Sequence, residues 1–141
     1  MTADFIRLNL DWNAEPNDPG ERVEVDGADL RLSFILNPWE HDAAEGERAD
    51  LVFTDCEKWR LGATNDEGWH RGDCRYSGVA PTWGEFYEIV GHDALRDAPN
   101  DWHQIRAAQP QLRHFLFYLR DHTFECVATG WRLVRQPSNV C

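Results

Sequence analysis

One stretch, from Leu112 to Val127, constrains the fold of this chain more than any other. It contains five consecutive apolar residues, Phe115 to Leu119, then the polar group Arg120-Asp121-His122, and then a second run from Thr123 to Ala128. Aromatic and β-branched residues in runs of this length favour strands over helices. We therefore predict an antiparallel hairpin whose arms lie in the middle of the hydrophobic core.

The predicted hairpin has one apolar face and one mixed face. With a turn at Asp121-His122 or over residues 120–123, Leu119 opposes Phe124 and Phe117 opposes Cys126, and opposed residues share a face. The apolar face contains Phe115, Phe117, Leu119, Phe124, Cys126 and Ala128. The mixed face contains His114, Leu116, Tyr118, Arg120, Thr123, Glu125 and Val127. A shift of one residue would bury Arg120 and Glu125 in the core, so the division into faces is well constrained.

A second hairpin is predicted around Asp26-Gly27, a pair that favours a type I′ turn. Its arms are Arg22 to Val25 and Ala28 to Leu36, with Val25 opposite Ala28. Further strands are expected at Phe5–Trp12, Leu51–Leu61, Cys74–Tyr76, Glu85–Val90, Trp102–Arg106 and Trp131–Val134.

No segment has a clear helical period, and the roughly eight short strands are separated by turn signals at intervals of about ten residues. This pattern predicts an all-β fold, an antiparallel sandwich or barrel, in a single domain over residues 1–141. The choice between sandwich and barrel stays open.

The 141-residue chain has a net charge of −11, and the acidic surplus lies entirely in its first half. Residues 1–70 contain 17 Asp and Glu against 6 Lys and Arg, whereas residues 71–141 contain 8 of each sign. An acidic surface opposes nucleic-acid binding and suits a basic protein partner.

Because there is neither a signal-like N-terminus nor an apolar run of about 18 residues, we expect a cytoplasmic protein that does not bind a membrane. The 13 Arg against 1 Lys suggest a GC-rich, bacterial genome.

The four cysteines do not form a metal-binding pattern. Cys56, Cys74, Cys126 and Cys141 are widely spaced and include no C-x-x-C pair, so we predict no zinc site and no cofactor. Cys126 lies on the apolar hairpin face and is interpreted as a small core residue. Whether Cys56 and Cys74 pair with each other stays open.

Two regions contain residues capable of chemistry. The irregular stretch Gly62–Pro81 is long for a loop in a compact domain. Its Asp66, Glu67, Trp69, His70 and Asp73 could bind a ligand or metal or transfer protons, although turn formation alone would select similar residues. The mixed hairpin face offers a second candidate groove, formed by His114, Tyr118, Arg120 and Glu125. A half-exposed sheet face would explain that second set equally simply.

The seven tryptophans suggest a binding surface. Trp39, Trp69 and Trp83 are flanked by Gly, Pro and acidic residues and are expected near the surface, where tryptophan often contributes to interfaces. The motifs of serine hydrolases, phosphate-binding loops and zinc proteases are missing from the sequence. Our leading hypothesis is therefore a non-catalytic acidic domain that binds a basic protein, of the immunity or antitoxin type. The alternatives are a small-ligand or enzymatic barrel with its site on Gly62–Pro81, and carbohydrate binding by the three tryptophans.

Overall fold

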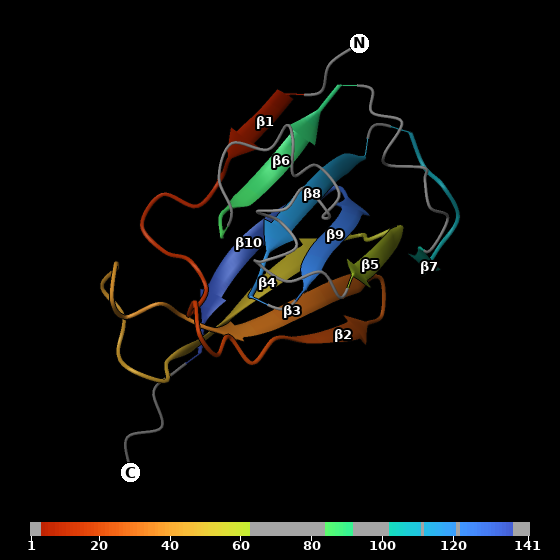
Figure 1. Cartoon of the computed structure of the whole chain (residues 1–141). Coiled ribbons are helices and arrows are strands. Elements are labelled where there is room, and N and C mark those ends of the chain that lie inside the picture. The colour runs from red at the N-terminus through yellow and green to blue at the C-terminus, as the bar shows by residue number, and fades with distance from the viewer. Residues whose placement is uncertain (1–3, 63–83, 92–101, 111, 121, 137–141) are drawn as a thin grey trace.

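The described part of the chain forms two antiparallel β-sheets packed as a sandwich (Figure 1). The computed structural model describes residues 4–62, 84–91, 102–110, 112–120 and 122–136. Their strands are β1 (Asp4–Arg7), β2 (Arg22–Asp26), β3 (Asp29–Ile35), β4 (Arg48–Thr54), β5 (Lys58–Gly62), β6 (Phe86–Val90), β7 (His103–Gln104), β8 (Arg113–Tyr118), β9 (Thr123–Ala128) and β10 (Gly130–Arg135). These described residues contain no helix, so the predicted all-β fold is confirmed.

The sheets have six and four strands, in the orders β1-β6-β8-β9-β5-β7 and β10-β4-β3-β2. Strands from both halves of the sequence contribute to each sheet. Within the described ranges, no helix is long and apolar enough to cross a membrane. The predicted strand at Cys74–Tyr76 and most of the stretch Gly62–Pro81 lie outside the described residues.

The hairpin β8–β9 has the predicted faces but not the predicted pairs. All six residues of the predicted apolar face belong to the core between the sheets. However, Phe117 opposes Phe124 instead of Cys126, and the N–H of Leu119 donates to the carbonyl oxygen of His122 at 2.8 Å. The pairing is therefore displaced by two residues. Because side chains alternate with a period of two, this displacement changes the partners and leaves both faces intact.

The hairpin β2–β3 shows the same displacement. Val25 opposes Leu30, whereas the Asp-Gly turn predicted that it would oppose Ala28. Gly27 has a φ of 63° and Ala28 has a negative φ, which is the pattern of a type II′ turn with glycine first. The turn is therefore centred one residue later than predicted, on Gly27 and Ala28.

The predicted strand Phe5–Trp12 is wrong in its second half. Strand β1 ends at Arg7, and Leu10, an apolar residue within the predicted strand, is 81% exposed. The reason is Asn9, whose side-chain amide is fully buried and donates to the main-chain oxygen of Trp12 at 2.8 Å. This hydrogen bond within three residues replaces the extended alternation, while Trp12 still reaches the core.

The predicted single strand Leu51–Leu61 is wrong, because this stretch forms two strands in different sheets. The chain leaves the four-stranded sheet after β4 and enters the six-stranded sheet at β5, passing through Asp55 with a φ of 48°. The crossing from β9 to β10 lies beside it, because the N–H and hydroxyl of Thr129 both donate to the oxygen of Thr54 at 2.9 Å. The two crossings form one corner that joins the sheets.

Aromatic rings fill the space between the sheets. The ring of Phe53, on β4, lies 5.4 to 6.0 Å from the rings of Phe86, Phe115 and Phe124, which come from three strands of the opposite sheet. Cys126 lies in this core as predicted, and Cys56 lies beside it. Both are reduced thiols, and burial raises the pKa of Cys126.

We predict that Phe53→Ala destabilises the protein by about 3–5 kcal/mol, because it removes the ring that contacts three strands of the other sheet. The free energy of unfolding from urea titration measures this loss. Val25→Ala is the control, since Val25 is half exposed on the edge strand β2 and should cost below about 0.5 kcal/mol. Equal losses for the two variants would contradict the role assigned to Phe53.

Candidate functional site

The mixed face of the β8–β9 hairpin contains a buried ion cluster. Glu125 accepts two hydrogen bonds of 2.9 Å from Arg60, on the neighbouring strand β5, and a nitrogen of His114 lies 2.9 Å from the same carboxylate. The exposed fractions of these three side chains are only 1 to 3%. The sequence therefore correctly places His114 and Glu125 on one face, but that face is covered.

An indole ring stacks on this cluster. The guanidinium carbon of Arg60 lies 3.9 Å from the centre of the Trp102 ring, and the imidazole of His114 lies 6.0 Å from it. Arg60 is thus held between a carboxylate and a π-face, two partners that favour its charged form. Burial raises the pKa of Glu125, but the hydrogen bonds from His114 and Arg60 outweigh burial and lower that pKa to about 2. At neutral pH the Glu125 carboxylate is therefore ionised, and it holds the Arg60 guanidinium.

The predicted groove of four residues is divided between two places. Tyr118 is buried and Arg120 is exposed, and both line a different recess from the His114–Glu125 cluster. The other predicted site residues lie outside the described residues: Asp66, Glu67, Trp69, His70 and Asp73. In the described ranges no group of three His, Cys, Asp or Glu side chains could hold a metal ion.

The recess that includes Tyr118 lies beside two loops, residues 8–21 and 36–47, which we call the acidic loops. The middle of the first loop lies beside the start of the second, because Ala14 forms a β-bridge with Leu36 and the N–H of Asn37 donates to the oxygen of Asn13 at 2.9 Å. The recess has a volume of about 190 Å³. It is lined by Asn13, Ala14, Glu15, Pro16, Asn37, Glu40, Gly84, Glu85, Tyr118, Leu119 and Arg120.

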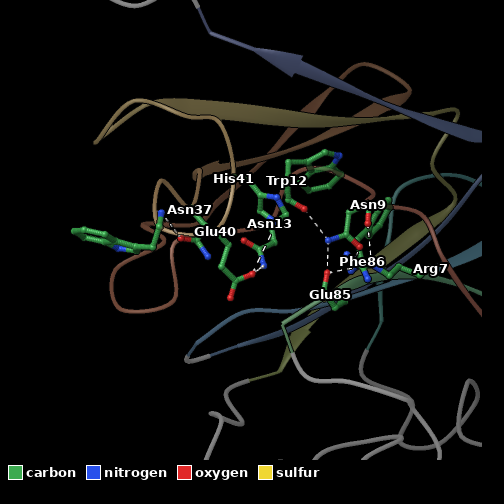
Figure 2. Close-up of polar contacts among 10 residues, drawn as sticks. Arg7, Asn9, Trp12, Asn13, Asn37, Glu40, His41, Glu85 and Phe86 are labelled. Atoms are coloured by element: carbon green, nitrogen blue, oxygen red, sulfur yellow. Dashed lines mark hydrogen bonds and ion pairs between the residues drawn. The ribbon is translucent and has the colours of Figure 1, made fainter.

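Asn9 fixes one wall of this recess (Figure 2). Its amide group donates to the oxygen of Trp12 and to the carboxylate of Glu85, and its oxygen accepts a hydrogen bond of 3.0 Å from the N–H of Phe86. Arg7 lies 3.5 Å from the same Glu85 carboxylate. The loop after β1 and the start of β6 are thereby held together, and Glu85 is held at the edge of the recess.

Asn13, Glu40 and His41 point toward one another on the other side of the recess (Figure 2). The amide nitrogen of Asn13 donates to Glu40 at 3.3 Å, and His41 lies 3.9 Å from the same carboxylate. Yet the Asn13 amide oxygen and the His41 Nε2 atom are buried without a hydrogen-bond partner. Across the described residues only four buried side-chain atoms lack one, and three of them, including an oxygen of Glu21, belong to the acidic loops. Buried polar atoms are nearly always satisfied, so this concentration is typical of a site that a partner or water completes.

Sequence reasoning did not identify Asn9, Asn13, Asn37, Glu40 or Glu85. Three asparagines within residues 9–17 were a weak signal, because asparagine also serves turns. Trp39 was identified, and it is 71% exposed as predicted; the other two expected surface tryptophans, Trp69 and Trp83, lie outside the described residues.

We predict that Glu125→Gln costs about 3–5 kcal/mol, since it leaves the Arg60 charge buried and without its carboxylate. The matched control is Glu88→Gln, which breaks a second bidentate pair, with Arg113, that is partly exposed. That control should cost about 1 kcal/mol or less. Urea unfolding at neutral pH compares the two, and a control as costly as Glu125→Gln would contradict the importance of burial.

The lowered pKa of Glu125 also predicts a specific sensitivity to acid. A carboxyl group whose pKa is lower in the folded than in the unfolded state stabilises the fold above its unfolded pKa, near 4.5. This contribution, on the order of 3 kcal/mol, is lost as the pH falls from about 4.5 toward about 2. The stability difference between the unaltered protein and Glu125→Gln should therefore shrink over that interval, and a constant difference would count against the lowered pKa.

Comparisons with known proteins do not assign this fold or this site to a family. No protein-family model matches the chain, and no curated protein or solved structure matches it either.

Proposed function

We propose that this chain is a binding domain whose acidic loops engage a basic protein. The observation that supports this most directly is the charge of the two loops. Residues 8–21 and 36–47 contain eight carboxylates and neither Lys nor Arg. Since the two loops lie side by side at Ala14 and Leu36, their charges add to one local negative potential that attracts and steers a cationic surface.

Most of these carboxylates are available to a partner. The five exposed ones have no Lys or Arg partner among the described residues: Asp11, Asp18, Glu40, Asp42 and Glu45. By contrast, Glu21 is paired with His122, and Glu47 lies 3.4 Å from Arg135. Unpaired carboxylates of like charge repel one another, so a basic partner would relieve a repulsion that the free protein retains.

Trp39 supplies an apolar contact within this charged surface. Its indole is largely exposed, while its main-chain N–H donates to the side-chain oxygen of Asn37 at 2.9 Å. The backbone that carries the indole is therefore anchored before any partner binds. Exposed tryptophans of this kind often contribute most of the binding energy at protein interfaces.

The recess beside the loops fits a lysine or arginine side chain of the partner. Glu40 and Glu85 contribute carboxylates to its lining, and the Asn13 amide adds an acceptor oxygen that has no partner. Arg120, also in the lining, donates to the main-chain oxygen of Asn17 at 2.7 Å. A basic toxin neutralised by an immunity-type protein is one concrete partner with this chemistry.

We predict that removing three loop charges weakens partner binding at least tenfold, whereas removing three charges elsewhere does not. The test variant combines Asp18→Asn, Asp42→Asn and Glu45→Gln. The control combines Asp4→Asn, Glu24→Gln and Asp26→Asn, which changes the net charge equally. The partner is captured from native lysate at low salt, eluted with salt and purified, and its Kd is measured for each variant by calorimetry. Together, three charges at the rim of an interface change the Kd by about tenfold.

Trp39→Ala, tested separately, should weaken binding by about thirtyfold or more, because it removes the apolar contact without changing charge. The partner should also be basic, and its Kd should rise steeply with salt. Capture of no salt-sensitive basic protein, or equal weakening by the loop and control triples, would overturn the proposal.

A further inference from the structure

A second polar cavity lies on the outer face of the four-stranded sheet, and it is built mainly from residues outside the acidic loops. Side chains of Arg22, Ser33 and Asp50 form a row across the neighbouring strands β2, β3 and β4. They line a cavity of about 390 Å³ together with Arg31 and Gln136. This volume falls in the range of sites for small molecules, about 300–1,000 Å³.

Arg22 lines this cavity and Arg48 lies beside it, and neither has a hydrogen bond to a carboxylate among the described residues. Arg48 donates to the hydroxyl oxygen of Ser33 at 3.0 and 3.2 Å and to the main-chain oxygen of Gly20 at 2.8 Å. Burial lowers the pKa of Arg48, the nearby charge of Arg22 lowers it further, and the charge of Asp50 opposes part of this lowering. Arg22 is exposed and has no ion pair within the described part of the chain. Two like charges therefore lie close together, and the anion near them, Asp50, is bonded to Gln136 and Arg31.

The buried carboxylate nearby is already occupied. One oxygen of Asp50 accepts a hydrogen bond of 2.9 Å from Gln136, and the other lies 3.5 Å from Arg31. The lining itself has a formal charge of zero, because Arg22 and Arg31 are balanced by Glu24 and Asp50. Arg48 lies beside the lining, and Arg31 also lies 3.9 Å from Asp26.

Two side chains of the lining can donate further hydrogen bonds. The oxygen of Ser33 accepts both bonds from Arg48, so its hydroxyl hydrogen remains to donate to another group. Arg22 lies directly across from Ser33 in the sheet, and its guanidinium carries a planar set of donors that matches an oxyanion. We propose that this cavity binds the carboxylate or phosphate group of a small molecule between Arg22 and Ser33.

Titration of the whole protein with inorganic phosphate and with citrate tests this inference. Binding is followed by calorimetry, and by ³¹P line broadening for phosphate, at constant ionic strength. We expect saturable binding of at least one probe with a Kd of about 1 mM, weakened about tenfold by Arg22→Gln. The control is Arg132→Gln, which removes an exposed charge from the same sheet face outside the cavity, where residue 132 opposes Val52. The control should keep the affinity.

Ser33→Ala is a second, uncharged test of the same geometry. It should weaken probe binding several-fold with no change of net charge, and thermal melting checks that each variant is folded. Because the acidic loops take no direct part, the triple variant of the loops should bind the probe as the unaltered protein does, whether or not a basic partner exists. Absence of saturable binding of both probes, or equal weakening by Arg22→Gln and Arg132→Gln, would overturn the inference.

Discussion

The contact of Phe53 with three rings of the opposite sheet is the interaction on which the rest of the structure depends. Each sheet has one apolar face that is unstable in water unless the other sheet covers it. The aromatic layer between the sheets satisfies both faces at once. It also fixes which residues of β2, β3 and β4 face outward, because their alternate residues are buried in this layer.

The two sheets use their outer faces differently. In the six-stranded sheet, the outer face is closed over Arg60 and Glu125, whose charges are satisfied by each other, by His114 and by the Trp102 ring. Replacing the whole of such a buried pair by well-packed apolar residues often costs little, but removing one member alone is costly. In the four-stranded sheet, the outer face stays open, and its charges at Arg22 and Glu24 remain available to solvent. The closed face anchors the structure, and the open face is the one for which we propose recognition.

The sequence predicted which face of a strand each residue occupies better than which residues pair across neighbouring strands. Alternation with a period of two placed Phe115, Phe117 and Cys126 in the core correctly, but it cannot distinguish pairings that differ by two residues. Turn chemistry was meant to make that distinction, and at Gly27 it failed because the turn uses glycine first. The strand predicted at Leu51–Leu61 failed for another reason. A corner between sheets looks like a strand with polar interruptions when the second sheet is unknown.

The candidate sites were predictable only in part, for the same reason. The negative charge of the first half and the exposure of Trp39 follow from local composition. The pairing of Ala14 with Leu36, and of Glu125 with Arg60, joins residues far apart in the chain, and no local pattern encodes those meetings. The cavity lined by Arg22 and Ser33 was not predicted, because its polar residues come from three strands. Each of these strands alone shows only the ordinary alternation of apolar and polar residues.

The corner at Thr54 and Thr129 has a consequence for how the chain is made. Strand β4 needs β10 as its outer neighbour, and β1 needs β6, so neither sheet can be completed from the first half of the chain. During synthesis from the N-terminus, the β2–β3–β4 meander can form early, but its apolar face stays uncovered until β8 and β9 emerge. The protein should therefore pass through a period of exposed aromatic surface on the ribosome, which is when a chaperone would matter most to it.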